Sequence, residues 1–170
     1  MRNNKELILK KFKKIHVSKK HLKWLNDKDV RRYSTVRKKH TLNSQKDFLK
    51  KKLNDKSNII FKKIYKKMHI GVLEISKINT FHKHCEINYL IGEKKLWNRK
   101  LGTKVVSYAV NYVKKNLKLK KILAGTFLNN KASIKVLLNN GFKKEGVIKN
   151  FYLDDLTKIR IHHLWLGKDL

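Results

Sequence analysis

The sequence has no proline, one cysteine and only 12 acidic residues among its 170. The single cysteine, Cys85, excludes an internal disulfide framework and a zinc site built from several cysteines. No apolar run approaches the roughly 18 residues of a membrane span, and the opening stretch MRNNKELILKKFKK lacks the long apolar core of a signal peptide. These absences favour a protein of the cytoplasm without a membrane span.

The scarcity of acidic residues leaves 44 lysines and arginines largely uncompensated, with a formal net charge of +32. Such a charge favours a polyanionic partner such as a nucleic acid or a phosphorylated ligand. However, abundant Lys, Asn and Ile without Pro is also the residue usage of an AT-rich genome, and the cations are scattered along the chain. Both explanations stay open. Because aromatic and basic residues do not interleave as in known readers, no specific nucleic-acid partner is predicted.

The length and the hydrophobic fraction of 41% predict one domain over residues 1–170. Hydrophobic periodicity predicts the order β, α, α, β, β, β, α, β, α, β, β. The expected strands cover residues 6–12, 58–66, 69–77, 84–92, 121–127, 142–149 and 158–166. The expected helices begin near Ser18, near Thr41 or Ser44, near Gly102 and near Asn130. Phe48, Leu49 and Leu53 are expected on one face of the second helix. On the fourth helix, Ile134, Leu137 and Leu138 are expected to point inward.

The stretch WNRKLG, residues 97–102, lies where a predicted strand passes into a predicted helix. The first N–H groups of a helix are unpaired and the helix dipole is positive there, so this junction suits an anion. Arg99 and Lys100 add two cations, and Gly102 permits a close approach of the backbone. A pyrophosphate fits this chemistry, and a solvated basic turn is the alternative.

A second motif, NKASIKVLLNNGFKKEG, places Asn130 and Ser133 at a helix start and Gly-Phe and Glu-Gly after the helix. With the junction, it resembles the GCN5-related N-acetyltransferase (GNAT) superfamily, in the branch with nucleotide-amino-sugar and ribosomal-protein N-acetyltransferases. The pyrophosphate loop of that family, Arg/Gln-x-x-Gly-x-Gly/Ala, is matched only at Gly102, because Trp97 and Lys100 replace its first two defined residues. The resemblance extends over nearly the whole chain. It implies an α/β fold with a single mixed, mostly antiparallel twisted sheet, a central splayed parallel strand pair and flanking helices.

The resemblance further implies an acetyl-CoA-dependent N-acetyltransferase that requires no metal. The pantetheine arm would lie between strands 87–92 and 121–127, and a backbone N–H near Leu90 or Ile91 would stabilise the developing oxyanion. The cofactor-binding residues implied in this way are Leu90, Ile91, Gly92, Asn98, Arg99, Lys100, Leu101, Gly102, Thr103 and Asn130.

Acetyl transfer to an amine needs a base for the amine proton, and a proton donor assists the leaving thiolate. Glu86 is the first candidate base because CEINYL runs toward the expected reaction centre, and Glu74 is the second; an ion pair with a lysine is the alternative role of Glu86. Many family members have a proton-donating tyrosine at the position of Leu137, so Ser133 is the candidate donor here, with helix capping as its alternative. The pair 162–163, two histidines on the closing strand, is interpreted as half-buried surface.

The acceptor is predicted from HLKWLNDKDVRRYSTVRKKHTLNSQ, residues 21–45. This stretch resembles acetyltransferases that act on nucleotide-linked amino sugars of surface-glycan pathways. The implied acceptor residues are Trp24, Asn26, Arg32 and Tyr33, since aromatic rings stack on sugars or bases and arginine binds a diphosphate; a core position is the alternative for Trp24. Acetylation of a protein N-terminus, ribosomal or other, is the alternative function, and a non-catalytic nucleic-acid-binding module is the third. A homodimer is compatible with the sequence.

Overall fold

The structure is a computed structural model that describes residues 7–13, 17–34, 39–154 and 157–170. The first expected strand starts at Glu6, which lies outside the described residues. No helix among the described residues is both long and apolar enough to cross a membrane.

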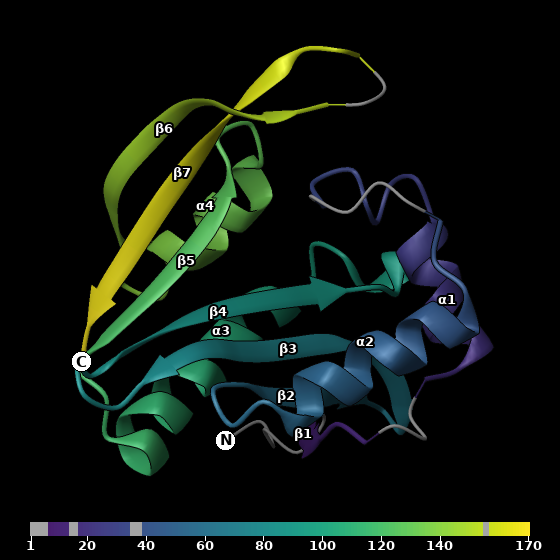
Figure 1. Ribbon diagram of the computed structural model, residues 1–170, viewed down its shortest axis with the longest axis horizontal. Coiled ribbons are helices and arrows are strands. Elements are labelled where there is room, and N and C mark those ends of the chain that lie inside the picture. The colour runs from purple at the N-terminus through teal and green to yellow at the C-terminus, as the bar shows by residue number, and fades with distance from the viewer. Residues whose placement is uncertain (1–6, 14–16, 35–38, 155–156) are drawn as a thin grey trace.

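A seven-stranded sheet forms the centre of the molecule, in the order β1-β2-β3-β4-β5-β7-β6 (Figure 1). Neighbouring strands run antiparallel except for β4 and β5, which are parallel. The predicted order of elements and the predicted mixed sheet are therefore confirmed. The strands are β1 (Leu7–Lys11), β2 (Ile59–Tyr65), β3 (Met68–Asn79), β4 (His84–Ile91), β5 (Lys121–Phe127), β6 (Lys143–Leu153) and β7 (Arg160–Asp169).

The helices cover both faces of this sheet, α1 and α2 on one face and α3 and α4 on the other (Figure 1). Their N-termini form at residues suited to capping: Ser18 caps α1, Thr41 caps α2 and Asn130 caps α4. The four helices are α1 (Lys19–Asn26), α2 (Leu42–Asn54), α3 (Leu101–Tyr112) and α4 (Lys131–Leu138), with a 3-10 turn, η3 (Lys94–Leu96), and a π-helical turn, η4 (Val113–Leu117).

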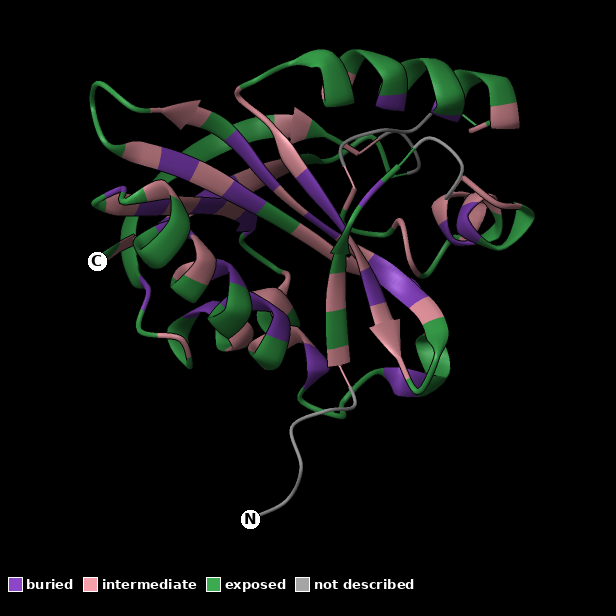
Figure 2. Cartoon of the chain, turned by 90° about the horizontal axis from the view of Figure 1, so that it is seen from below, coloured by how far each residue is buried: buried purple, intermediate pink, exposed green. Residues whose placement is uncertain are grey.

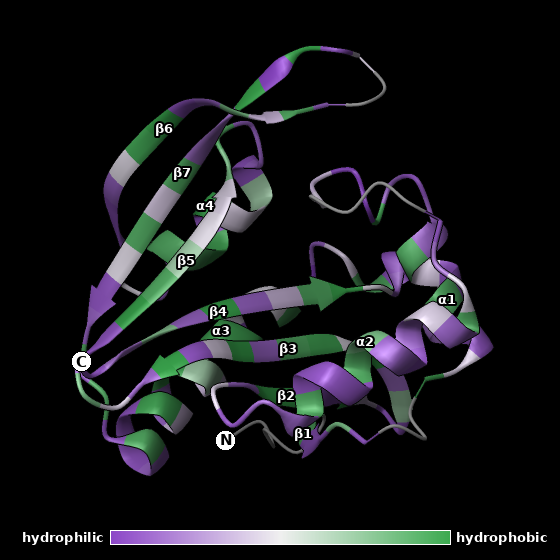
Figure 3. Cartoon of the chain, viewed as in Figure 1, coloured by the Kyte–Doolittle hydropathy of each residue, from purple (hydrophilic) through white to green (hydrophobic). Residues whose placement is uncertain are grey.

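The main core lies between the sheet and α3, whose Val105, Val106 and Ala109 are fully buried. Figure 2 shows buried residues concentrated on the strands and on the inner sides of the helices, and Figure 3 shows α2 mainly hydrophilic on its outer side. Leu138, predicted to point inward, is 44% exposed instead. Phe48 and Leu53, expected on one face of α2 with Leu49, are also exposed, at 50% and 37%. The reason is that α2 buries only Gln45 and Leu49 and α4 only Leu137, a narrower stripe than the apolar pattern suggests.

Two tight turns confirm predicted chain reversals. The β2–β3 hairpin turns at Lys66 and Lys67, which both have positive φ angles of 45° and 64°. Two-residue hairpin loops favour this conformation, although Asn-Gly adopts it more readily than two lysines. After α4, Gly141 has a φ of 77°, as expected for a glycine that ends a helix.

Candidate functional site

The parallel strands β4 and β5 pair only at their beginnings and then separate. Their register covers three residue pairs, from His84 with Lys121 to Glu86 with Leu123. Beyond them the strands diverge into the wedge visible between β4 and β5 in Figure 1. A cavity of about 640 Å³ occupies this region, lined by residues of β3, β4, β5, β6, β7, α1 and α4 and of the loop after α1. We call it the main cavity, and it fits the splayed pair that the resemblance predicted.

The β4–α3 junction places unusual backbone conformations beside a helix start. Asn98 and Lys100 have positive φ angles of 61° and 56°, a region that favours glycine. Lys100 is the N-cap residue of α3, and no side chain caps this helix, whereas Ser18, Thr41 and Asn130 cap the other three α-helices of the described chain. The first N–H groups of α3 are therefore left for another acceptor, as an anion site requires.

The side chains of this junction divide into exposed and packed residues. Asn98, Arg99 and Lys100 are exposed, whereas Leu101 is only 4% exposed and belongs to the core. A Cβ on Gly102 would lie 3.2 Å from Val136 and 3.6 Å from Tyr89. Leu101 can therefore offer a ligand only its backbone, and Gly102 lets α3 approach α4 and β4 closely.

The end of β4 has several of its backbone groups occupied. The Leu90 carbonyl accepts a hydrogen bond from Lys63 Nζ at 3.2 Å, and the Ile91 carbonyl accepts one from Trp97 Nε1 at 2.8 Å. The Gly92 N–H donates to the Ile70 carbonyl at 2.9 Å. A pantetheine arm would add its hydrogen bonds to these, which a carbonyl allows because it has two lone pairs.

The start of α4 brings together two hydroxyl groups. Asn130 caps the helix by accepting from the Ser133 N–H at 3.2 Å, so the Ser133 hydroxyl is not the cap. That hydroxyl lies 3.1 Å from the hydroxyl of Tyr89, and both residues line the main cavity. Burial raises the pKa of Tyr89, and the hydrogen bond to Ser133 partly opposes this effect. Leu137 is buried beside them, as expected.

The two candidate bases both line the main cavity and both form ion pairs. Glu86 Oε1 lies 2.8 Å from Lys77 Nζ, and Glu74 Oε1 lies 2.8 Å from Lys52 Nζ. The side chains of the two glutamates are similarly exposed, 19% and 20%. Their order as base candidates therefore rests on position, since Glu86 lies on β4 at the point where the pairing with β5 ends.

His163 was interpreted as half-buried surface, and this was wrong. It is 6% exposed, lines the main cavity and packs against Gly125 and Trp165. Burial lowers the pKa of His163, and the charge of Glu86 acts in the opposite direction. His163 therefore lies close enough to the candidate base for the charge of Glu86 to act on its pKa.

The predicted acceptor residues occupy different environments. Trp24 is 6% exposed and packs against His69 and the backbone of Gly92, so it is mainly a core residue at the cavity wall. The Asn26 side-chain amide donates to the His40 carbonyl at 2.9 Å and accepts from the His40 N–H at 2.8 Å, and these two hydrogen bonds close the loop that follows α1. Both side chains stabilise the wall, and neither presents the free polar or stacking surface that was expected.

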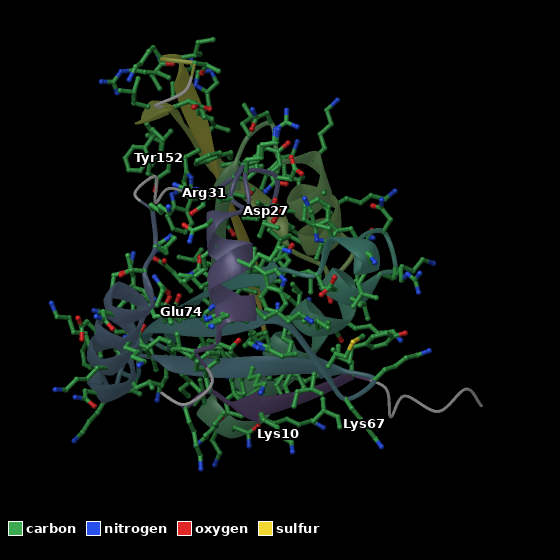
Figure 4. All side chains as sticks on the ribbon, turned by 90° about the vertical axis from the view of Figure 1, so that its right-hand side faces the viewer. Lys10, Asp27, Arg31, Lys67, Glu74 and Tyr152 are labelled. Atoms are coloured by element: carbon green, nitrogen blue, oxygen red, sulfur yellow. The ribbon has the colours of Figure 1, made fainter. Side chains whose placement is uncertain are left out.

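Arg32 and Tyr33 border a second cavity of about 670 Å³. Its charged lining consists of Lys28, Arg31, Arg32 and Asp154. Arg31 and Tyr33 also line the main cavity, so the two spaces share a wall. In the side view of Figure 4, Arg31 and Tyr152 lie together above the sheet while Glu74 lies lower, close to the strands.

Asp27 ties the loop after α1 to the turn after β4. Its carboxylate lies 2.9 Å from Lys94 Nζ and accepts hydrogen bonds from the N–H groups of Asp29 and Val30. The hydrogen bond to Lys94 is the main reason that the pKa of Asp27 is lowered. The loop after α1 and the β4–α3 junction are thus joined through this ion pair.

A sequence model described as an acetyltransferase (GNAT) domain matches residues 6–143. The chain belongs to this family. Its relatives include the uncharacterized N-acetyltransferase YoaA of Bacillus subtilis, 34% identical over 88 residues that make up 52% of this chain and 49% of that protein. Another is the [ribosomal protein uS5]-alanine N-acetyltransferase of Escherichia coli, 34% identical over 89 residues, or 51% of this chain and 44% of that protein. The chain thus aligns with about half the length of these curated relatives.

A solved GNAT structure, spermidine N-acetyltransferase from Vibrio cholerae in complex with CoA and spermine, superposes with a TM-score of 0.88. The superposition covers 98% of this chain and 96% of that one at 17% sequence identity. At this identity the likeness establishes the shared fold, and the predicted GNAT fold is confirmed.

Tyr89 in the main cavity and the buried Lys63 that contacts the end of β4 were missed from the sequence, and the burial of His163 was misjudged. For Tyr89 a signal exists, since the alternation in CEINYL puts it on the same face as Cys85 and Ile87, which pack against α3. No three His, Cys, Asp or Glu side chains within the described ranges gather as they would around a metal ion.

Proposed function

We propose that the protein is an acetyl-CoA-dependent N-acetyltransferase whose acceptor is the amine of a nucleotide-linked amino sugar in surface-glycan biosynthesis. The observation that carries this proposal is the main cavity, which begins where β4 and β5 separate and shares a wall with a basic second cavity. Family membership supports the reaction, because GNAT domains transfer acetyl groups from acetyl-CoA to amines.

The cofactor would bind along the wedge and the β4–α3 junction. The uncapped N–H groups at the start of α3 suit the pyrophosphate, and Arg99 and Lys100 add positive charge. Leu90, Ile91 and Gly92 would flank the pantetheine arm, with the backbone at Asn98, Leu101, Gly102 and Thr103 near the phosphates and Asn130 near the arm.

In the reaction, the neutral amine attacks the thioester carbon, an oxyanion develops and the C–S bond then breaks. Glu86 would accept the amine proton, directly or through water. The Tyr89 hydroxyl, hydrogen-bonded to Ser133, is placed to protonate the leaving thiolate and would fill the role left empty by Leu137. In this proposal Tyr89 takes the role of proton donor that was predicted for Ser133 from the sequence, and Ser133 holds the Tyr89 hydroxyl by a hydrogen bond.

The charges around the site favour an anionic acceptor. Arg31 lines both cavities, and Arg32 and Lys28 line the second cavity beside it. The two carboxylates of the main cavity, Glu74 and Glu86, are paired with lysines. A diphosphate suits such arginines, whereas a polyamine would require unpaired carboxylates. The acceptor that we propose therefore differs from the one named for the spermidine enzyme.

Acetylation of a protein N-terminus is the second candidate, favoured by the relative that acetylates an alanine of ribosomal protein uS5. A thiol-release assay with acetyl-CoA should compare nucleotide amino sugars, peptides beginning with Ser or Ala, and spermidine. We expect turnover with a nucleotide amino sugar that persists at moderate salt, whereas non-specific oligonucleotide binding by scattered lysines weakens steeply with salt.

Two arginine variants test the location of the acceptor. Arg32→Ala should raise the KM of the acceptor by about tenfold and leave that of acetyl-CoA unchanged, because a charge-assisted contact is lost. Arg99→Ala, the same change at the β4–α3 junction, should affect acetyl-CoA instead. If only peptides are acetylated, the proposal of a sugar acceptor is refuted. If no substrate releases CoA and the protein binds oligonucleotides tightly at high salt, the proposal that the protein is an enzyme is refuted.

A further inference from the structure

Lys63 is a fully buried lysine in the middle of β2, with 0% of its surface exposed. Its Nζ donates to the Leu90 carbonyl at 3.2 Å and lies 5.3 Å from the centre of the Tyr89 ring. None of the ion pairs found among the described residues includes Lys63. Burial alone lowers the pKa of Lys63 well below its usual range. A buried amine without a carboxylate is costly for stability, so its place in the core calls for a function.

Gly71 makes room for the contact between Lys63 and β4. It pairs with Lys63 across the β2–β3 ladder and with Ile91 across the β3–β4 ladder. A Cβ on Gly71 would overlap the Leu90 carbonyl oxygen. That oxygen therefore lies over Gly71, on the same sheet face as the Lys63 side chain. Lys63 can reach the oxygen because Gly71 has no side chain between them.

The orientation of this carbonyl determines where the next N–H points. The Leu90 C=O and the Ile91 N–H belong to one planar trans peptide, so they point in opposite directions. With the carbonyl directed toward Gly71 of β3, the Ile91 N–H is directed away from β3, toward the side of β4 from which β5 separates. This is the side on which the thioester would lie if the proposed acetyl transfer is correct.

We propose that Lys63 is a positioning residue for acetyl transfer, which holds the Leu90–Ile91 peptide so that the Ile91 N–H donates to the oxyanion. The inference rests on the proposed function and selects Ile91 over Leu90 as the donor. Lys63 transfers no proton in this role. Its removal should therefore lower the rate of the chemical step without weakening cofactor binding.

The test compares Lys63→Met with Lys62→Met, the same replacement one residue earlier on the opposite face of β2. Lys63→Met should fold with equal or higher thermal stability, bind CoA as the wild type does, and lose kcat by roughly 10²-fold. The pH dependence of kcat should keep its shape. Lys62→Met should retain kcat. Unchanged kcat in folded Lys63→Met, or loss of one limb of the pH profile, would overturn the role.

Gly71→Ala is a second variant that leaves Lys63 in place. Its Cβ must displace the Leu90 carbonyl, so it should reproduce the loss of kcat; a folded Gly71→Ala enzyme with full kcat overturns the proposal. A readout without turnover is the Ile91 amide resonance, which acetyl-CoA should shift in the wild type and not in Lys63→Met. No shift in either protein would refute the role of Ile91. A wild type that binds acetyl-CoA with this shift but acetylates nothing would refute the proposed function alone.

Discussion

Acidification should destabilise the protein through His21, which lies on α1 among Phe12, Trp24 and His69. His21 is 4% exposed, and burial, aided by the nearby His40, lowers its pKa from 6.5 to about 4. The unfolded chain therefore binds this proton first as the pH falls. The stability that depends on neutral His21 is complete above about pH 6.5 and is lost progressively between about pH 6.5 and about pH 4.

The size of this effect follows from the shift. Each unit of pKa difference corresponds to about 1.4 kcal/mol, so the whole shift is worth about 3.5 kcal/mol, of which roughly 2 kcal/mol is lost between about pH 7 and about pH 5. Typical domains have a free energy of unfolding of only about 5–15 kcal/mol. Urea unfolding of the wild type at both pH values should therefore show a clear fall.

The decisive comparison is His21→Leu, which removes the titrating group whatever it does to stability at neutral pH. Its loss of stability between the two pH values should be smaller than that of the wild type by roughly 2 kcal/mol. His82→Leu, the same replacement at an exposed turn, separates the loss of a buried histidine from the loss of any histidine. Equal pH dependence of the wild type and His21→Leu would refute the reasoning, and would direct attention to His40 and His163, whose pKa values burial also lowers.

Two further predictions concern the active site. Glu86→Gln should lower kcat by roughly 10²–10⁴-fold, while acetyl-CoA binding, measured by calorimetry, is retained. If Glu86→Gln and Glu74→Gln instead lowered kcat by the same small factor, the amine proton would be lost to water or solution and not to Glu86. Lys100→Gly should raise the free energy of unfolding, measured with urea, by up to about 1 kcal/mol. A left-handed residue with a Cβ is strained by roughly 1–2 kcal/mol, and glycine relieves this strain. The greater freedom of glycine in the unfolded chain offsets part of the gain. Lys118→Gly, at a left-handed residue outside the junction, is the matched control, and a destabilised Lys100→Gly would show that the lysine side chain matters more than the backbone.

The order of the elements was predictable because each helix and strand carries its own period, and the caps at Ser18, Thr41 and Asn130 lie where the pattern changes. Contacts across the sheet were not predictable in this way. Lys63 and Leu90 are 27 residues apart, and Tyr89 and Ser133 are 44 apart. Such pairs depend on strand register, which a local pattern does not encode.

The β4–α3 junction, residues 97–102, shows how residue identity and backbone conformation can separate. Its mismatch with the family pattern concerns the first glycine, where this chain has Lys100. Lys100 nevertheless has a left-handed backbone, with a φ of 56°, a conformation that glycine adopts more readily than any other residue. The conformation that turns the chain into α3 is therefore retained at the cost of some strain, and a cation is gained beside the uncapped N–H groups. In a chain with a net charge of +32, Lys100 is a cation that lies at an uncapped helix start, whatever the origin of the other positive charges.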